Sequence, residues 1–212
     1  MSRSAAFRLP LVFACLLALA AAAAFAQEAV RISPAEAESI GRRIWRNECE
    51  GTRDGLTSWN RGEDFASLGI GHFIWYPAGR RGAFKESFPA LRDYLRSQGV
   101  RLPGWLADAK ACPWPDRAAF MADFRSPRME ELRSLLASTV GKQARFAALR
   151  LEEALPQMLA AAPASQREKI RANFYRVAAA PGGLYALMDY VNFKGEGTSP
   201  TERYAGEGWG LL

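Results

Sequence analysis

The stretch from residue 56 to residue 76 most restricts what this chain can fold into, because helical periodicity is absent throughout it. Glycines stand at positions 62, 69 and 71, and β-favouring residues follow in Ile70, Phe73, Ile74, Trp75 and Tyr76. Side chains of this kind favour strands, and glycines between them mark turns. Pro77-Ala78-Gly79 then ends the segment. The pattern predicts one small β hairpin.

A helix is predicted directly before this segment. Ser33 is a capping residue, Pro34 stands at the first helical position and Glu36 at the third. Apolar residues then recur at helical spacing until glycines at 51 and 55 interrupt the pattern. We predict a helix over residues 34–49, with this inward face: Ala37, Ile40, Ile44 and Trp45.

The rest of the chain is mostly helical in pattern. Proline and serine starts, glycine stops and apolar periodicity predict six further helices, over residues 89–98, 115–124, 127–139, 142–155, 165–179 and 183–193. Pro156 is expected to kink or break the fourth of these. The predicted fold class is α+β, predominantly helical, with the hairpin inserted after the first helix.

The N-terminus has the pattern of a secretory signal peptide. A basic start is followed by an apolar run that ends in Ala24-Phe25-Ala26, so we expect cleavage after residue 26. An uncleaved membrane anchor is the alternative. We interpret residues 27–212 as a single domain that is periplasmic or secreted, with no further apolar stretch long enough to span a bilayer.

Charge and cysteine content narrow the partners. The formal net charge of +6 falls to about +4 without Arg3 and Arg8, which suits an anionic cell-wall polymer or a membrane surface. No basic run indicates nucleic acid binding.

Cys49 and Cys112 remain after processing, and an even count in an exported chain favours a disulfide, with two buried free thiols as the alternative. Because His72 is the only histidine, we expect no metal site, and we expect no cofactor.

One carboxylate of the first helix stands out by position. Glu48 lies one turn beyond Ile44 and about 40° around the helix axis, so it shares the apolar stripe. A carboxyl group on such a stripe is desolvated, which favours the protonated form that a general acid needs. If the helix frays before residue 48, the side chain instead points to solvent.

Three motifs together resemble the lysozyme-like superfamily, which includes phage-type lysozymes and lytic transglycosylases. Trp45-Arg46-Asn47-Glu48 is similar to their glutamate-bearing helix end, and Ser67-Leu68-Gly69-Ile70-Gly71-His72 to a Thr-x-Gly-x-Gly-His motif, with serine replacing threonine. The run 206–212 loosely resembles their glycine-rich turns. The specific part of the resemblance covers about residues 40–76.

The resemblance implies a fold, a reaction and a set of roles. Glu48 is the implied general acid. Glu50 is its rival, because the phage-type glutamate directly precedes a glycine. Glu63 and Asp64 are candidates for a second carboxylate, although neither stands at the family spacing. Ser67 and Asn60 are expected to orient water or the saccharide.

Aromatic and polar residues complete the predicted site. Trp59, Trp75 and Tyr76 are expected to stack on sugars, unless they are core residues. Asn192 has the surroundings of a cleft wall, unless the C-terminal segment is an exposed tail. His72 is interpreted as a structural brace for the acid-bearing helix.

The expected function is cleavage of peptidoglycan or a related glycan by an exported glycosidase. It would be a lysozyme, or a lytic transglycosylase, which needs only one acid because a sugar hydroxyl attacks. The alternatives are a non-catalytic periplasmic glycan-binding protein and a structural envelope protein with the same fold.

Overall fold

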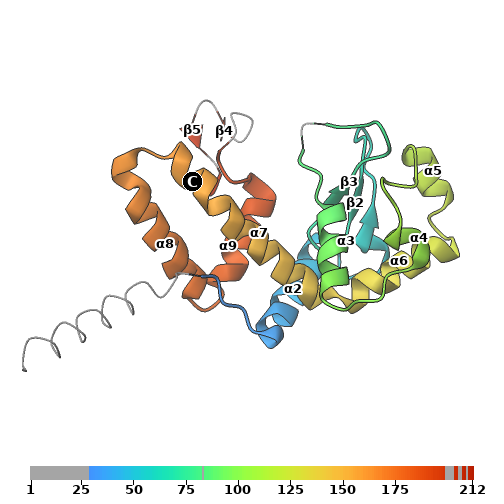
Figure 1. Cartoon of the computed structure of the whole chain (residues 1–212), viewed down its shortest axis with the longest axis horizontal. Helices are drawn as coiled ribbons and strands as arrows, with labels where there is room; N and C mark the ends of the chain where they lie inside the picture. The colour runs from blue at the N-terminus through green and yellow to red at the C-terminus, as the bar shows by residue number, and fades with distance from the viewer. Residues whose placement is uncertain (1–28, 83, 199–202, 205–206, 209) are drawn as a thin grey trace, which may run out of the picture.

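The computed structural model describes residues 29–82, 84–198, 203–204, 207–208 and 210–212. The predicted signal peptide therefore lies outside the described residues. Figure 1 shows a sheet with surrounding helices at one end of the molecule and a helical group at the other, joined by the long helix α7. None of the helices within these ranges is long and apolar enough to cross a bilayer.

The first described helix, α2 (Pro34–Glu48), forms where its capping pattern predicts. The Ser33 hydroxyl accepts a hydrogen bond of 3.1 Å from the Glu36 amide, and Pro34 occupies the first turn. Ala37, Ile40 and Ile44 are buried, as the apolar stripe predicts.

A three-stranded antiparallel sheet replaces the predicted hairpin. It consists of β1 (Thr57–Ser58), β2 (Ala66–Leu68) and β3 (Phe73–Trp75), in that order, after the short 3-10 helix η1 (Asp54–Leu56). Ala66 pairs with Trp75 and Leu68 with Phe73, so one face of the sheet is wholly buried. The extra strand β1 was not predicted, because two residues are too few to show a period of two.

The remaining helices follow the sequence pattern closely. Their bounds are α3 (Phe88–Ser97), α4 (Gly104–Ala107), α5 (Arg117–Ala122), α6 (Pro127–Ser138), α7 (Val140–Ala161), α8 (Arg167–Ala179) and α9 (Gly183–Lys194). The short α4, the 3-10 helix η2 (Ala164–Gln166) and the two-stranded pair β4 (Arg203–Tyr204) and β5 (Glu207–Gly208) are additional.

The sequence predicted a kink or a break at Pro156, and the break is wrong, because α7 continues through this residue to Ala161. A proline inside a helix removes one main-chain hydrogen bond. Here the residues around it, Leu155, Met158 and Leu159, are all buried in the core. Packing of this apolar face compensates for the lost bond, so the helix is not broken.

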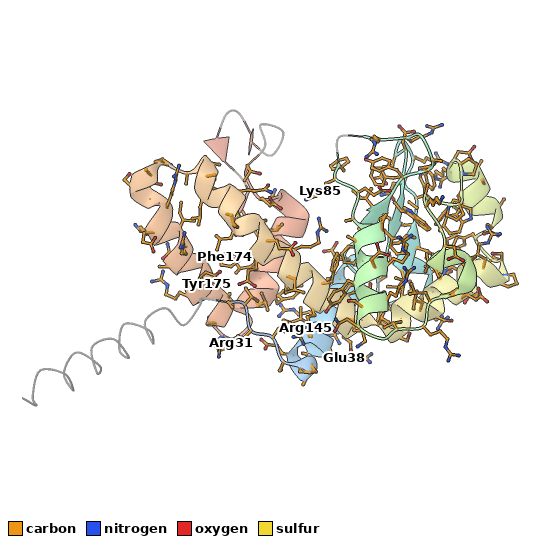
Figure 2. All side chains as sticks on the ribbon, viewed as in Figure 1. Arg31, Glu38, Lys85, Arg145, Phe174 and Tyr175 are labelled. Carbon is orange, nitrogen blue, oxygen red and sulfur yellow. The ribbon has the colours of Figure 1, made fainter. Side chains whose placement is uncertain are left out.

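Helices α2 and α7 pack at very close range through two glycines. A β-carbon on Gly41 would approach the Val140 carbonyl oxygen to 2.7 Å, and one on Gly141 would meet Glu38 at the same distance. The Glu38 carboxylate also accepts a 3.1 Å hydrogen bond from the Gly141 amide, which otherwise lacks a partner in the first turn of α7 (Glu38 is labelled in Figure 2). The contact fixes α2 across the start of the long helix.

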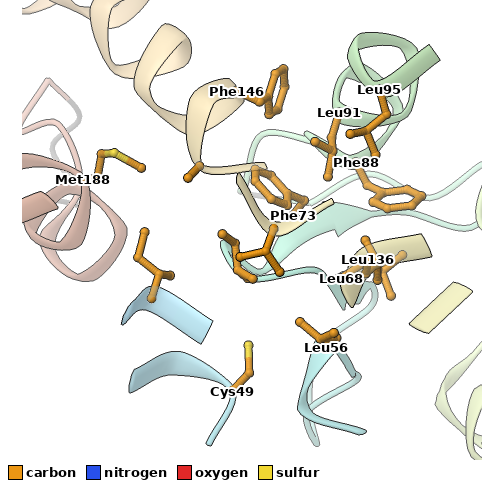
Figure 3. Packing of buried hydrophobic residues seen from close by; sticks show 14 of the residues in the cluster. Cys49, Leu56, Leu68, Phe73, Phe88, Leu91, Leu95, Leu136, Phe146 and Met188 are labelled. Atoms are coloured by element: carbon orange, nitrogen blue, oxygen red, sulfur yellow. The ribbon is translucent and has the colours of Figure 1, made fainter. Parts of the chain in front are cut away.

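The main core lies between the sheet, α3, α6 and α7. Phe73 of β3 lies between Leu68 and Phe146 in Figure 3, with its ring centre 5.6 Å from that of Phe146. Trp75 packs in the same way on Phe88 of α3, at 4.8 Å. The buried face of the sheet is thus covered by helices that come much later in the sequence.

A buried glutamine joins the loop after β2 to α7. Gln143 has no exposed surface; its side-chain oxygen accepts from the Ile70 amide at 3.0 Å, and its amide nitrogen donates to the Leu136 carbonyl at 2.6 Å. Gly69 is required beside it, because its φ is +74° and a β-carbon there would lie 2.3 Å from the Gln143 oxygen. The Gly-x-Gly-His loop is therefore bound to α7 through the side chain of Gln143.

Replacement of Gln143 by leucine should lower the free energy of unfolding by roughly 2–3 kcal/mol, because the buried Ile70 amide would lose its partner. Denaturation in urea measures the loss. Gln157→Leu is the matched control, since Gln157 is on the exposed face of the same helix, and should change stability by less than about 0.5 kcal/mol. Equal effects of the two substitutions would contradict this description of the loop.

Candidate active site

A small cleft, with about 20 Å³ of space or room for about one water molecule, opens where the two ends of the molecule meet. It is lined by Ile44 of α2, Ile70 and Gly71 of the loop after β2, Ala147 of α7, and Met188 and Asp189 of α9. Four elements that are far apart in the sequence therefore contribute to one site.

Glu48 is the last residue of α2 and its side chain is exposed, so the expectation that it is buried on the apolar stripe is wrong. The physical reason is the end of the helix. Glu48 follows the cleft-lining Ile44 by one turn on the same side, but no part of the core extends far enough to cover it. The carboxylate is exposed to solvent instead of desolvated within the protein, and Glu48 is not one of the residues that line the cleft.

The end of α2 contacts the Gly-x-Gly-His loop through His72. The His72 Nε2 atom lies 3.2 Å from the Glu48 carbonyl oxygen and 3.9 Å from the Cys49 sulfur. This is the contact expected of a residue that braces the helix. His72 itself has a φ of +48°, an uncommon conformation for a residue with a side chain.

The predicted disulfide is not present, because Cys49 and Cys112 are separate, buried free thiols. Each has its own place in the fold: the Cys49 sulfur lies 3.8 Å from the Gly69 carbonyl oxygen, and the Cys112 amide donates to the Tyr76 carbonyl. Burial raises the pKa of each thiol to about 12, and the nearby charge of Glu48 adds to the effect on Cys49. Neither thiol is a nucleophile near neutral pH.

The three aromatic residues expected to stack on sugars are core residues. Trp75 has no exposed surface, and Trp59 and Tyr76 are each 4% exposed. The Trp59 indole donates to the Glu63 carbonyl at 2.7 Å, and the Tyr76 hydroxyl donates to the Phe84 carbonyl at 3.2 Å. A side chain with so little exposed surface does not offer a face to a saccharide, so this prediction is wrong.

The two candidates for a second carboxylate do not face Glu48. Glu63 accepts a 3.2 Å hydrogen bond from Asn60, and Asp64 is exposed and paired with Arg80 at 2.9 Å. Both acids precede β2, whereas the loop beside Glu48 follows β2. At about 3.3 Å per strand residue, the opposite ends of this sheet are separated by roughly 10 Å or more. The structure brings neither carboxylate to the cleft.

Three other residues were predicted to belong to the site: Ser67, Glu50 and Asn192. Ser67 lies in the middle of β2, paired with Ser58 and Ile74 on the less buried face of the sheet, and is 5% exposed. Glu50 is exposed and has a φ of +55°. Asn192 belongs to α9, but its side chain is outside the described part of the structure.

A hydrogen-bonded chain at the cleft was missed by the sequence analysis. The Asn47 amide donates to the Tyr185 hydroxyl at 2.8 Å, and this hydroxyl donates to the Asp189 carboxylate at 2.9 Å. The spacing of Tyr185 and Asp189, four residues apart on α9, is a signal that could have been noticed. Their contact with Asn47, 138 positions away from Tyr185 in the sequence, has no local signal.

Comparison of the chain with protein-family models, curated proteins and solved structures gave no match. Among the described residues, no group of three or more histidine, cysteine, aspartate or glutamate side chains is arranged to hold a metal ion. The chemistry of the site is therefore argued from its own residues.

The buried thiols should make stability fall as the solution becomes alkaline. An unfolded cysteine ionises near its ordinary pKa of 9.0, whereas the folded thiols ionise near 12. The unfolded chain thus releases protons first, so the free energy of unfolding should fall as pH rises from 9 to 12. Chemical denaturation across this range measures the fall.

The control is a variant with Cys49→Ala and Cys112→Ala, which keeps the titration of tyrosine and lysine but lacks both thiols. Its stability should fall less steeply with pH than that of the unsubstituted protein. An identical pH dependence, or a disulfide-linked peptide containing both cysteines in a protease digest, would contradict the assignment of buried free thiols.

Proposed function

We propose that the protein is a glycosidase that cleaves the glycan strand of peptidoglycan or a related polymer, with Glu48 as the general acid. The observation that carries the proposal is the position of residue 48 at the end of a braced helix, one turn beyond a residue that lines the cleft; the desolvation expected from the sequence is absent, so the proposal rests on position alone. A general acid has to reach its substrate while its main chain is held still.

Two contacts favour Glu48 over Glu50. The carbonyl of Glu48 is the group that His72 contacts, so residue 48 is directly tied to the loop that lines the cleft. The negative charge of Glu48 also contributes to raising the pKa of Cys49, whose sulfur lies against Gly69 of the same loop. Both observations tie the main chain at residues 48 and 49 to the loop, whereas residue 50 has no such contact with it among the described residues.

The chemistry asked of Glu48 is proton donation to the oxygen of the scissile glycosidic bond. The anomeric carbon then gains positive charge, and the attacking oxygen comes from water in a lysozyme or from a sugar hydroxyl in a lytic transglycosylase. A positioned general acid contributes typically 10²–10⁴-fold to the rate of such a step.

The choice of polymer is supported by charge and by the sequence. The net charge of about +4 expected after cleavage favours an anionic cell-wall substrate, and the N-terminal pattern predicts export to the compartment where peptidoglycan lies. The Ser-Leu-Gly-Ile-Gly-His resemblance to lysozyme-like enzymes points to the same substrate class.

The test is digestion of purified peptidoglycan by the protein and by Glu48→Gln and Glu50→Gln variants. We expect the protein to digest the substrate, Glu48→Gln to lose at least about 100-fold of the rate, and Glu50→Gln to keep most of it. No digestion by the unsubstituted protein would overturn the proposal in favour of a non-catalytic glycan-binding role. An active Glu48→Gln variant would overturn the assignment of the acid.

A further inference from the structure

We propose that Asp189 of α9 is the second carboxylate of this site and accepts the proton of the attacking oxygen. The inference rests on the proposed function, because it assigns a role in the same reaction. It places the two carboxylates on different elements: one at the end of α2 and one on α9. The sequence analysis instead assigned this role to Glu63 or Asp64, next to the sheet.

The first observation is that Asp189 lines the cleft itself. It does so together with Ile44, Ile70 and Gly71, which are the neighbours of the Glu48 end of α2 and of the loop that braces it. The side chain is partly exposed, so a bound molecule can reach it. The other side chains that line the cleft are apolar, so Asp189 supplies its one charged group.

The second observation is that the carboxylate is held in place from the buried side. Its Oδ1 atom accepts the Tyr185 hydroxyl at 2.9 Å, and Tyr185 is only 8% exposed. The guanidinium group of Arg43 lies 3.8 Å from the centre of the tyrosine ring, a distance at which a cation and a ring face attract each other. The orientation of Asp189 is therefore set by a residue that is itself fixed.

The direction of the hydrogen bonds supports this role. A carboxylate only accepts, so the Tyr185 proton points to Asp189, and the hydroxyl oxygen is left to accept from Asn47 at 2.8 Å. Burial, followed by the hydrogen bond to Asp189, raises the pKa of Tyr185, so the phenol keeps the proton that it donates.

The same chain of hydrogen bonds connects the two carboxylates mechanically. Asn47 is the residue before Glu48, and its hydrogen bond to Tyr185 links the end of α2 to α9. The main chain next to the proposed acid is thus tied to α9 by two hydrogen bonds and one helical turn. We infer that Asn47 and Tyr185 are positioning residues.

The proposed step balances in protons and bonds. The bond between the anomeric carbon and the leaving oxygen breaks while Glu48 gives its proton to that oxygen. The attacking hydroxyl or water forms the new bond to the anomeric carbon, and its proton passes to Asp189. Glu48 then regains a proton from solvent and Asp189 loses one, so no further reactant is needed.

The experiment compares steady-state rates on peptidoglycan for the unsubstituted protein, Asp189→Asn, Asp189→Ala and Asp108→Asn. Asp108 is an exposed carboxylate at the end of α4 and is the control. We expect Asp189→Asn to lower kcat at least about 100-fold with little change in KM, and Asp108→Asn to keep the full rate. Added formate should restore part of the rate of Asp189→Ala, because a small carboxylate can replace the missing base.

Tyr185→Phe separates positioning from folding. The ring and its contact with Arg43 remain, and only the hydroxyl is lost, so we expect a kcat about 10-fold lower, an unchanged KM and a thermal unfolding midpoint within a few degrees. A structural role alone would change the midpoint and leave kcat per folded molecule unaltered.

The outcomes separate this inference from the proposed function. If the unsubstituted protein does not digest peptidoglycan, the proposed function fails. If it does and Asp189→Asn keeps its rate, or Asp189→Ala is not restored by formate, the assignment of Asp189 is overturned while the function stands. A loss of rate in Asp64→Asn with none in Asp189→Asn would return the role to the sheet side.

Discussion

The arrangement of the cleft depends on one buried amide side chain. Gln143, in the first turn of α7, accepts a hydrogen bond from the Ile70 amide and donates one to the Leu136 carbonyl near the end of α6. Without this bond the loop would have a buried amide with no partner, which is costly in a protein interior. The loop in turn contacts the end of α2 through His72, so Gln143 influences the position of Glu48 indirectly, through the loop.

The long helix α7 has a corresponding role on the opposite side. Its first turn packs closely against α2 at Gly41 and Gly141. Its later turns lie in the helical group that contains α9. The bond from Asn47 to Tyr185 connects α2 directly to α9. One helix and a few side-chain bonds therefore fix three elements around a cleft, with accessible carboxylates on two of them.

Local secondary structure was predictable from the sequence, whereas contacts between distant segments were not. The cap at Ser33, the prolines at 34 and 127 and the periodic apolar residues locate the helices well, since these signals lie within one turn. A break at Pro156 was wrongly allowed because the core that packs around this part of α7 comes from distant segments. The exposure of Glu48 was missed for a related reason: helical spacing gives the direction of a side chain but not where the covering core ends.

The candidate site shows the same division. The aromatic residues near the loop have the composition of a sugar platform, yet Trp75 is completely buried by α3. The two cysteines satisfy the counting rule for a disulfide and lie apart. Asp189 was not singled out because its significance comes from contact with residues far along the chain.

We propose that a glycan binds between Glu48 and Asp189. The most direct measurement is a crystal structure of the Glu48→Gln variant with a peptidoglycan tetrasaccharide. The account predicts a glycosidic oxygen within hydrogen-bonding distance of residue 48 and the sugar chain passing Gly71 and Asp189. A tetrasaccharide bound at another surface, with this cleft empty, would contradict it.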